Sequence, residues 1–196
     1  MKIAGVVLAG GLSSRMGQDK ATLLLQQKTL LTRNVELLNM LNLNAVLVSG
    51  DYTGFQCIQD NYHSLGPLGG IQASSQVLID GYDAMLIIPV DMPLLSIKEC
   101  EYLLQQFKKY PQGVFYEQVT FPMILPLSSK LTKYLSEALA SPHNKQRSLY
   151  RLLKTLKLQA INYQAKSHFR FKNSNTPEEW ADCLTLFNTL QRSKEL

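Results

Sequence analysis

The sequence has few cysteines, and they lie far apart. The three are Cys57, Cys100 and Cys183 among 196 residues. No two of them form the closely spaced pair that a structural zinc site needs, and so few thiols do not indicate a disulfide framework. Unpaired thiols in this pattern are typical of the reducing cytoplasm. We therefore expect a cytoplasmic protein whose cysteines are free, either in the core or at the surface.

Long hydrophobic runs are also missing. A membrane span needs about 20 consecutive apolar residues, and the apolar runs of this chain are far shorter. Residues 1–10 combine a lysine with an apolar stretch, as a signal peptide does, but the stretch is too short and leads into a glycine-rich loop. We expect neither a membrane segment nor a secretion signal.

Charge of one sign is only mildly in excess. The net charge is +5, the charged residues make up 18% of the chain, and the isoelectric point is about 9.1. Such a dispersed positive balance suits phosphorylated ligands without indicating nucleic acid. The hydrophobic fraction of 45% is sufficient for a core and excludes a disordered chain. The length predicts one domain, residues 1–196.

Short apolar runs alternate with longer segments of helical period. The predicted strands are residues 2–8, 45–48, 57–58, 84–90, 113–116, 123–127 and 159–163. The predicted helices are residues 29–41, 71–79, 96–110, 128–139, 146–156 and 176–190. This order favours an α/β fold with a mostly parallel sheet, in which ligands bind at the carboxyl ends of the strands. Residues 168–172 alternate charged and aromatic side chains, which predicts an edge strand.

The first predicted strand leads into the segment LAGGLSSRMGQDKA, residues 8–21. Gly10 and Gly11 allow the backbone to approach a ligand and to present N–H groups to phosphate oxygens. Arg15 can hold a phosphate with two N–H groups, and Lys20 adds a compact charge. Neither GxxxxGK[ST] nor GxGxxG is present. We expect this loop to bind phosphate; the alternative is an ordinary solvated basic turn.

An aspartate follows the most apolar predicted strand, in the sequence Pro-Val-Asp-Met-Pro of residues 89–93. Asp91 therefore belongs at the ligand-binding edge of the sheet. A carboxylate at that edge suits Mg²⁺ shared with substrate phosphates. From this feature alone, an aspartate that caps a turn is an equally good interpretation.

Two weaker signals complete the candidate site. Asp60 precedes a Gly-Pro-Leu-Gly-Gly segment, residues 66–70, which we expect to be a loop. Asp60 can bind a base or a sugar, or cap a turn. Asn173 and Asn175 precede the last predicted helix. Their amides can contact a heterocycle, although Asx-turn hydrogen bonding is the commoner use of such a pair.

Together these motifs resemble the nucleotidyltransferases of the GT-A-like, Rossmann-type fold, whose signature is LAGG-x-S-x-R-M-G-x-D-K-A. With Gly-Pro-Leu-Gly-Gly, Pro-x-Asp-Met-Pro and Asn-x-Asn-Thr-Pro-Glu-Glu, the chain resembles the molybdenum cofactor guanylyltransferases, the MobA family. The resemblance runs from about residue 3 to about residue 180, and residues 171–179 indicate this branch. It implies a three-layer, Rossmann-like nucleotidyltransferase fold with a mostly parallel central sheet.

The resemblance also implies a reaction. GTP and Mo-molybdopterin would give the guanine dinucleotide form of the cofactor and pyrophosphate, when the terminal phosphate of the pterin attacks the α-phosphorus of GTP. Catalysis would depend on positioning and charge neutralisation. The implied cofactor is Mg²⁺. The implied partners are the two substrates and proteins that deliver the pterin in transient contacts, with no nucleic acid and no membrane.

Residue roles follow from the same resemblance. The implied catalytic residues are Arg15, Lys20 and Asp91, with Asp91 as the metal ligand. The implied nucleotide-binding residues are Leu8, Ala9, Gly10, Gly11, Lys20, Ser49, Asp60 and Asp91. The implied pterin-binding residues are Gly70, Asn173 and Asn175.

The chain departs from the family pattern in three places, which keeps alternatives open. Ser49 stands where the family often has Asn, Phe121 stands where many members have His, and no second acid matches a metal position. A molybdopterin cytidylyltransferase and a sugar-phosphate nucleotidyltransferase are the nearest alternatives, and the Gly10-Gly11 pair favours the guanylyl branch. An adaptor that binds a nucleotide without catalysis is the alternative of another class.

Overall fold

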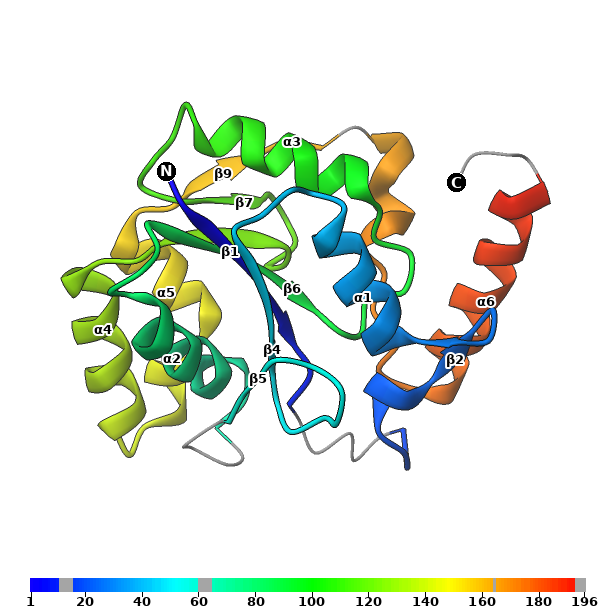
Figure 1. The fold of residues 1–196 in the computed structure, drawn as a ribbon, viewed down its shortest axis with the longest axis horizontal. Coiled ribbons are helices and arrows are strands. Elements are labelled where there is room, and N and C mark those ends of the chain that lie inside the picture. The colour runs from blue at the N-terminus through cyan, green and yellow to red at the C-terminus, as the bar shows by residue number, and fades with distance from the viewer. Residues whose placement is uncertain (11–15, 60–64, 164, 193–196) are drawn as a thin grey trace.

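The computed structural model describes residues 1–10, 16–59, 65–163 and 165–192. Three residues with predicted site roles, Gly11, Arg15 and Asp60, lie outside these ranges. Within the described ranges the chain folds around one seven-stranded sheet, which runs through the middle of the molecule with helices on both of its faces (Figure 1).

The strand order of the sheet is β5-β4-β1-β6-β8-β7-β9. The strands are β1 (Ile3–Leu8), β4 (Ala45–Ser49), β5 (Cys57–Ile58), β6 (Ala84–Pro89), β7 (Val114–Tyr116), β8 (Met123–Pro126) and β9 (Gln159–Ile161). Only β8 runs antiparallel to its neighbours in the sheet. The predicted α/β fold with a mostly parallel sheet is therefore confirmed.

The centre of the sheet consists of β1 and its neighbours β4 and β6. Every residue of β1 is buried, as expected for a strand that is covered on both faces. Leu8 pairs in register with Ser49 of β4 and with Pro89 of β6. The three strands therefore end at the same level, and the segments that follow them begin side by side.

Two helical layers cover the sheet. The helices are α1 (Leu30–Asn39), α2 (Pro67–Leu78), α3 (Ile97–Phe107), α4 (Ser129–Ala140), α5 (Leu149–Leu156) and α6 (Pro177–Arg192). Helices α2, α4 and α5 pack together on one face, whereas α1 and α3 contact strands from the other (Figure 1). Helix α6 packs beside α1, where the Arg33 guanidinium lies 5.0 Å from the centre of the Phe187 ring.

Two sequence predictions are wrong. The Gly-Pro-Leu-Gly-Gly segment is not a loop, because α2 already begins at Pro67. Proline suits this first helical position since its φ is preset and its missing N–H has no partner there. Residues 168–172 do not form an edge strand; most of them belong to a 3₁₀ helix, η3 (Ala165–Phe171). The Phe171 ring packs 4.8 Å from the ring of Tyr116, and this burial outweighs the alternating pattern.

The helix predicted over residues 146–156 is divided in the structure. A short 3₁₀ helix, η2 (Asn144–Arg147), comes first, and α5 begins at Leu149. Ser148 separates them in an extended conformation, and its Oγ caps α5 by accepting a hydrogen bond of 3.3 Å from the N–H of Arg151.

The expectations for the cysteines are confirmed. All three thiols are free; Cys100 and Cys183 are buried and Cys57 is half-buried. Across the described ranges we find no helix with the length and hydrophobicity that a bilayer crossing requires.

Candidate active site

A cleft of about 650 Å³ opens at the carboxyl ends of β1 and β6. One wall is the segment that follows β1, and a second is the segment that follows β6. Residues 118–121 and the segment before α6 close the other sides. The lining includes the predicted site residues Leu8, Ala9, Gly10, Lys20, Asp91, Asn173 and Asn175.

The chain turns sharply where β1 ends. The N–H groups of Ala9 and Gly10 both donate to the carbonyl oxygen of Ser49, at 3.0 and 2.9 Å. These bonds fold the backbone across the end of β4 and bring Leu8, Ala9 and Gly10 to the cleft, as predicted.

Ser49 and Gly70 lie beneath the cleft and do not line it. Ser49 is 1% exposed, and a Cβ at Gly70 would stand 2.4 Å from its Oγ. Glycine at position 70 therefore allows α2 to pack closely on β4. This packing accounts for both residues in the structure, and the binding roles that the resemblance implies for them stay predictions.

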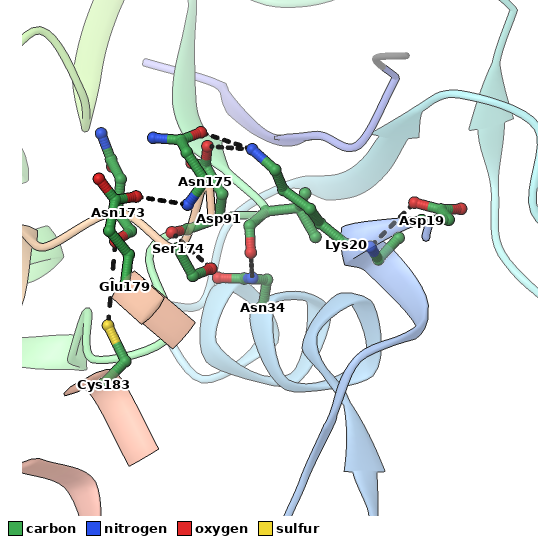
Figure 2. A network of polar contacts seen from close by, with 11 residues as sticks. Asp19, Lys20, Asn34, Asp91, Asn173, Ser174, Asn175, Glu179 and Cys183 are labelled. Atoms are coloured by element: carbon green, nitrogen blue, oxygen red, sulfur yellow. Dashed lines mark hydrogen bonds and ion pairs between the residues drawn. The ribbon is translucent and has the colours of Figure 1, made fainter. Parts of the chain in front are cut away.

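Lys20 joins three distant parts of the chain. It begins a 3₁₀ helix, η1 (Lys20–Thr22), whose N-cap Asp19 accepts a hydrogen bond of 3.0 Å from the N–H of Ala21. The Lys20 amine donates to Asp91 Oδ2 at 3.1 Å and to Asn175 Oδ1 at 2.5 Å. Figure 2 shows the amine pointing between these two oxygens.

The backbone around Asp91 is held from two sides. The Asp91 carbonyl accepts hydrogen bonds from the Ser174 N–H at 2.8 Å and the Ser174 hydroxyl at 3.3 Å. From α1, the Asn34 amide donates to the Val90 carbonyl at 3.3 Å (Figure 2). The Asp91 side chain is only about one-fifth exposed. The backbone that carries this carboxylate is therefore held on both sides.

The Asn175 side chain does not cap the helix that follows it. The helix is capped by other groups, since the Thr176 hydroxyl accepts from the Glu179 N–H at 3.2 Å and the Glu179 carboxylate accepts from the Asn175 N–H at 2.7 Å. The side-chain oxygen of Asn175 is instead bonded to Lys20 in the cleft. Asn173 lines the same cleft.

The lining residues fit a magnesium ion. Asp91 is the acid of the lining, beside the amide groups of Asn173 and Asn175. Mg²⁺ is commonly held by one or two carboxylates together with substrate phosphates and water. Within the residues that the structure describes, no group of three or more His, Cys, Asp or Glu side chains could form a closed metal site. The donor set therefore fits an ion held by Asp91 and shared with a substrate.

Sequence reasoning missed two residues that support the site. Asn34 is a polar residue on the buried face of α1, 4% exposed, and this position inside an apolar stripe is a signal that could have found it. Tyr52 lies in the segment between β4 and β5, where its hydroxyl contacts Ala9 and Asp19. No pattern in the sequence distinguishes Tyr52 from an ordinary packing residue.

Comparison with known proteins agrees with this architecture. The MobA-like NTP transferase domain matches residues 5–161. A molybdenum cofactor guanylyltransferase of Xanthomonas euvesicatoria pv. vesicatoria is 37% identical over 179 residues, which cover 90% of this chain and 92% of the relative. A molybdenum cofactor guanylyltransferase of Syntrophotalea carbinolica is 29% identical, covering 90% of this chain and 88% of the relative.

The fold also matches solved structures. The crystal structure of molybdopterin-guanine dinucleotide biosynthesis protein A from Archaeoglobus fulgidus superposes with a TM-score of 0.72 at 18% identity, covering 95% of this chain and 99% of that one. This likeness confirms the predicted three-layer nucleotidyltransferase fold. With the domain match and the 37% identical relative, it confirms the resemblance seen in the motifs: the chain belongs to the MobA-like NTP transferase family.

Proposed function

We propose that this protein transfers GMP from GTP to Mo-molybdopterin and releases pyrophosphate. The observation that carries the proposal is the meeting of Lys20, Asp91 and Asn175 in one cleft at the ends of β1 and β6. The guanylyltransferase relatives cover nine-tenths of the chain and support this choice of substrates. We place the reaction in the cytoplasm, with transient contact to proteins that deliver the pterin.

Charge neutralisation would be the main task of the protein. The nucleotide would lie along the backbone of Leu8, Ala9 and Gly10, and the Lys20 amine would neutralise charge on the phosphates and on the leaving pyrophosphate. Arg15 and Gly11, outside the described residues, are proposed to contact the same phosphates. Asp91 would hold Mg²⁺, which supplies a further positive charge to the phosphate oxygens.

The segment before α6 would position the second substrate. Asn173 and Asn175 lie on the segment that Ser174 ties to the Asp91 backbone. Amide side chains offer both donors and acceptors, which suits a pterin ring. The pterin phosphate would then approach the α-phosphorus of GTP beside Asn175, where the neighbouring Lys20 amine would neutralise phosphate charge.

The alternatives differ in the nucleotide they require. Ser49 is buried against α2, so its replacement of the family's usual Asn does not by itself argue for another base. A cytidylyltransferase remains the nearest alternative. The buried pairing of Lys20 with Asp91 argues against an adaptor without catalysis, because a binder has less need of a metal-binding carboxylate beside a phosphate-binding amine.

The proposal is tested by calorimetric titration with GTP, CTP, ATP and UTP in the presence of Mg²⁺. We expect a clear preference for GTP that is lost in Asp60→Ala, and a lower affinity for all four nucleotides in Lys20→Ala. Lys133→Ala is the matched control, since this lysine is 77% exposed and forms an ion pair with Glu137 on the same helix. A preference for CTP would move the protein to the cytidylyl branch. Failure to bind any nucleotide would favour the adaptor.

A further inference from the structure

We propose that Tyr52 is a positioning residue for the transfer reaction. Its hydroxyl contacts both Ala9 and Asp19, the two ends of segment 9–19, and thereby fixes the backbone from which the Lys20 side chain extends. This inference rests on the function proposed above. Tyr52 does not line the cleft, so it acts through other residues and not on the substrate.

The geometry places one hydroxyl between two acceptors. Tyr52 Oη lies 3.0 Å from the carbonyl oxygen of Ala9 and 2.9 Å from Oδ2 of Asp19. Ala9 directly follows β1, whereas Asp19 directly precedes η1. A single side chain from the β4–β5 segment therefore bridges the residue that follows β1 and the residue that precedes η1.

The hydroxyl has only one proton for these two oxygens. A carbonyl and a carboxylate both accept, so the proton is shared between them and the contact requires that Tyr52 be un-ionised. Burial, together with the hydrogen bond to Asp19, raises the pKa of Tyr52 well above its ordinary value. The Tyr52 hydroxyl therefore keeps its proton near neutral pH.

The position of the Tyr52 ring is itself determined by its neighbours. A Cβ at Gly50 would lie 2.6 Å from Tyr52 Cε2, so the ring occupies the space that the missing side chain leaves. The Tyr52 backbone is held by Cys57, whose Sγ lies 3.4 Å from the backbone nitrogen of Tyr52 and 3.3 Å from its carbonyl oxygen. Both contacts direct the ring toward Ala9 and Asp19.

The consequence for the cleft passes through Asp19. One oxygen of its carboxylate bonds Tyr52, and the other caps η1 through the N–H of Ala21. Lys20 lies between Asp19 and Ala21 in the chain and extends its amine to Asp91 Oδ2. Loss of the Tyr52 hydroxyl would release one of the two restraints on the Asp19 side chain and shift the point from which the Lys20 amine reaches the phosphates.

The test is the Tyr52→Phe variant, which keeps the ring and removes only the hydroxyl. We expect kcat for transfer to fall about tenfold while KM for GTP changes less than about threefold, because the displaced amine acts on charge that develops in the transition state. Tyr82→Phe is the matched control: Tyr82 is half-buried beside the amino end of β6, and its hydroxyl has no hydrogen-bond partner in the described ranges. We expect that control to retain wild-type kcat.

A second readout does not depend on catalysis. In the nucleotide-free protein, the backbone amide resonances of Gly10 and Ala21 should shift in Tyr52→Phe and stay in place in Tyr82→Phe, because these amides adjoin the two acceptors of the Tyr52 hydroxyl. Unchanged resonances together with a kcat within twofold of wild type would overturn the proposal. So would an equal loss of kcat in both variants. If the wild-type protein transfers no nucleotide, the proposed function fails, and the two resonances still decide whether Tyr52 makes the tie.

Discussion

The Lys20 amine lies 3.1 Å from the Asp91 carboxylate, although the two residues are 71 positions apart in the chain. The pair is largely buried, with side-chain exposures of 16% and 21%. It connects the segment after β1 to the segment after β6, and Asn175 joins it from the segment before α6. The proposed chemistry depends on this meeting point.

Removal of the Lys20 amine should slow transfer more than any other single substitution in the described part of the cleft. We expect Lys20→Ala to lower kcat by about 10²–10³, the typical cost of losing a group that stabilises transition-state charge. The measurement is the steady-state rate of pyrophosphate release, with Lys133→Ala as the control. A loss smaller than about threefold would remove Lys20 from the catalytic residues.

The Asp91→Asn variant tests the metal assignment. An amide keeps the shape of the side chain but loses its charge, so a much higher Mg²⁺ concentration should be needed for half-maximal rate. The measurement is the transfer rate as a function of Mg²⁺ concentration. If the wild-type and variant curves coincide, Asp91 is not the ligand.

Asn175 is expected to serve the pterin side of the cleft. Asn175→Ala should raise KM for Mo-molybdopterin by about five- to tenfold, because one hydrogen bond to a bound ligand is worth about 1–1.5 kcal/mol. Calorimetric affinity for GTP should change less than about threefold. An equal loss of affinity for both substrates would show that Asn175 acts only through its bond to Lys20.

The close packing of α2 on β4 should make the stability of the fold sensitive to a larger residue at position 70. A Cβ at Gly70 would stand 2.4 Å from Ser49 Oγ, so Gly70→Ala should lower the free energy of unfolding by about 1–3 kcal/mol. Combining it with Ser49→Ala removes that oxygen and should recover part of the loss. The measurement is urea unfolding of the single and double variants. Additive losses would mean that Gly70 and Ser49 are not in conflict through that atom.

Ionisation of the buried Cys183 thiol should lower the free energy of unfolding at alkaline pH. Burial raises the pKa of Cys183 from 9.0 to about 11. The unfolded chain therefore releases this proton first, and the contribution to stability is complete below about pH 9 and lost as the pH rises toward 11. Urea unfolding at a series of pH values should show a shallower decline in Cys183→Ala than in the wild type. Identical slopes would contradict the assignment.

The sequence predicted the sheet and part of the site for clear physical reasons. Buried parallel strands such as β1 and β6 are continuous apolar runs, and the carboxyl ends of such strands meet at one edge. The approach of Lys20 to Asp91 follows from that rule. The conformation of residues 66–70 was harder to predict, because glycine and proline usually indicate a loop. In the structure these residues form the start of α2, where Gly70 packs closely on Ser49.

The remaining site features depend on tertiary structure. The contact of Asn175 with Lys20 requires the path of η3 and α6 across the molecule, and no local pattern encodes that path. The bridge made by Tyr52 depends on a turn whose course is set by Gly50 and Cys57. Both contacts join residues far apart in the chain, and propensity and periodicity carry no information about such pairs.

The most direct test of the proposed function is transfer of the α-phosphate. The protein is incubated with Mo-molybdopterin, Mg²⁺ and GTP labelled at the α-phosphate, and the label is followed into the pterin product, with CTP labelled in the same way run in parallel. We predict that label enters the pterin from GTP, with one pyrophosphate released per transfer. Label that enters from CTP alone, or from neither nucleotide, would contradict the proposed guanylyl transfer.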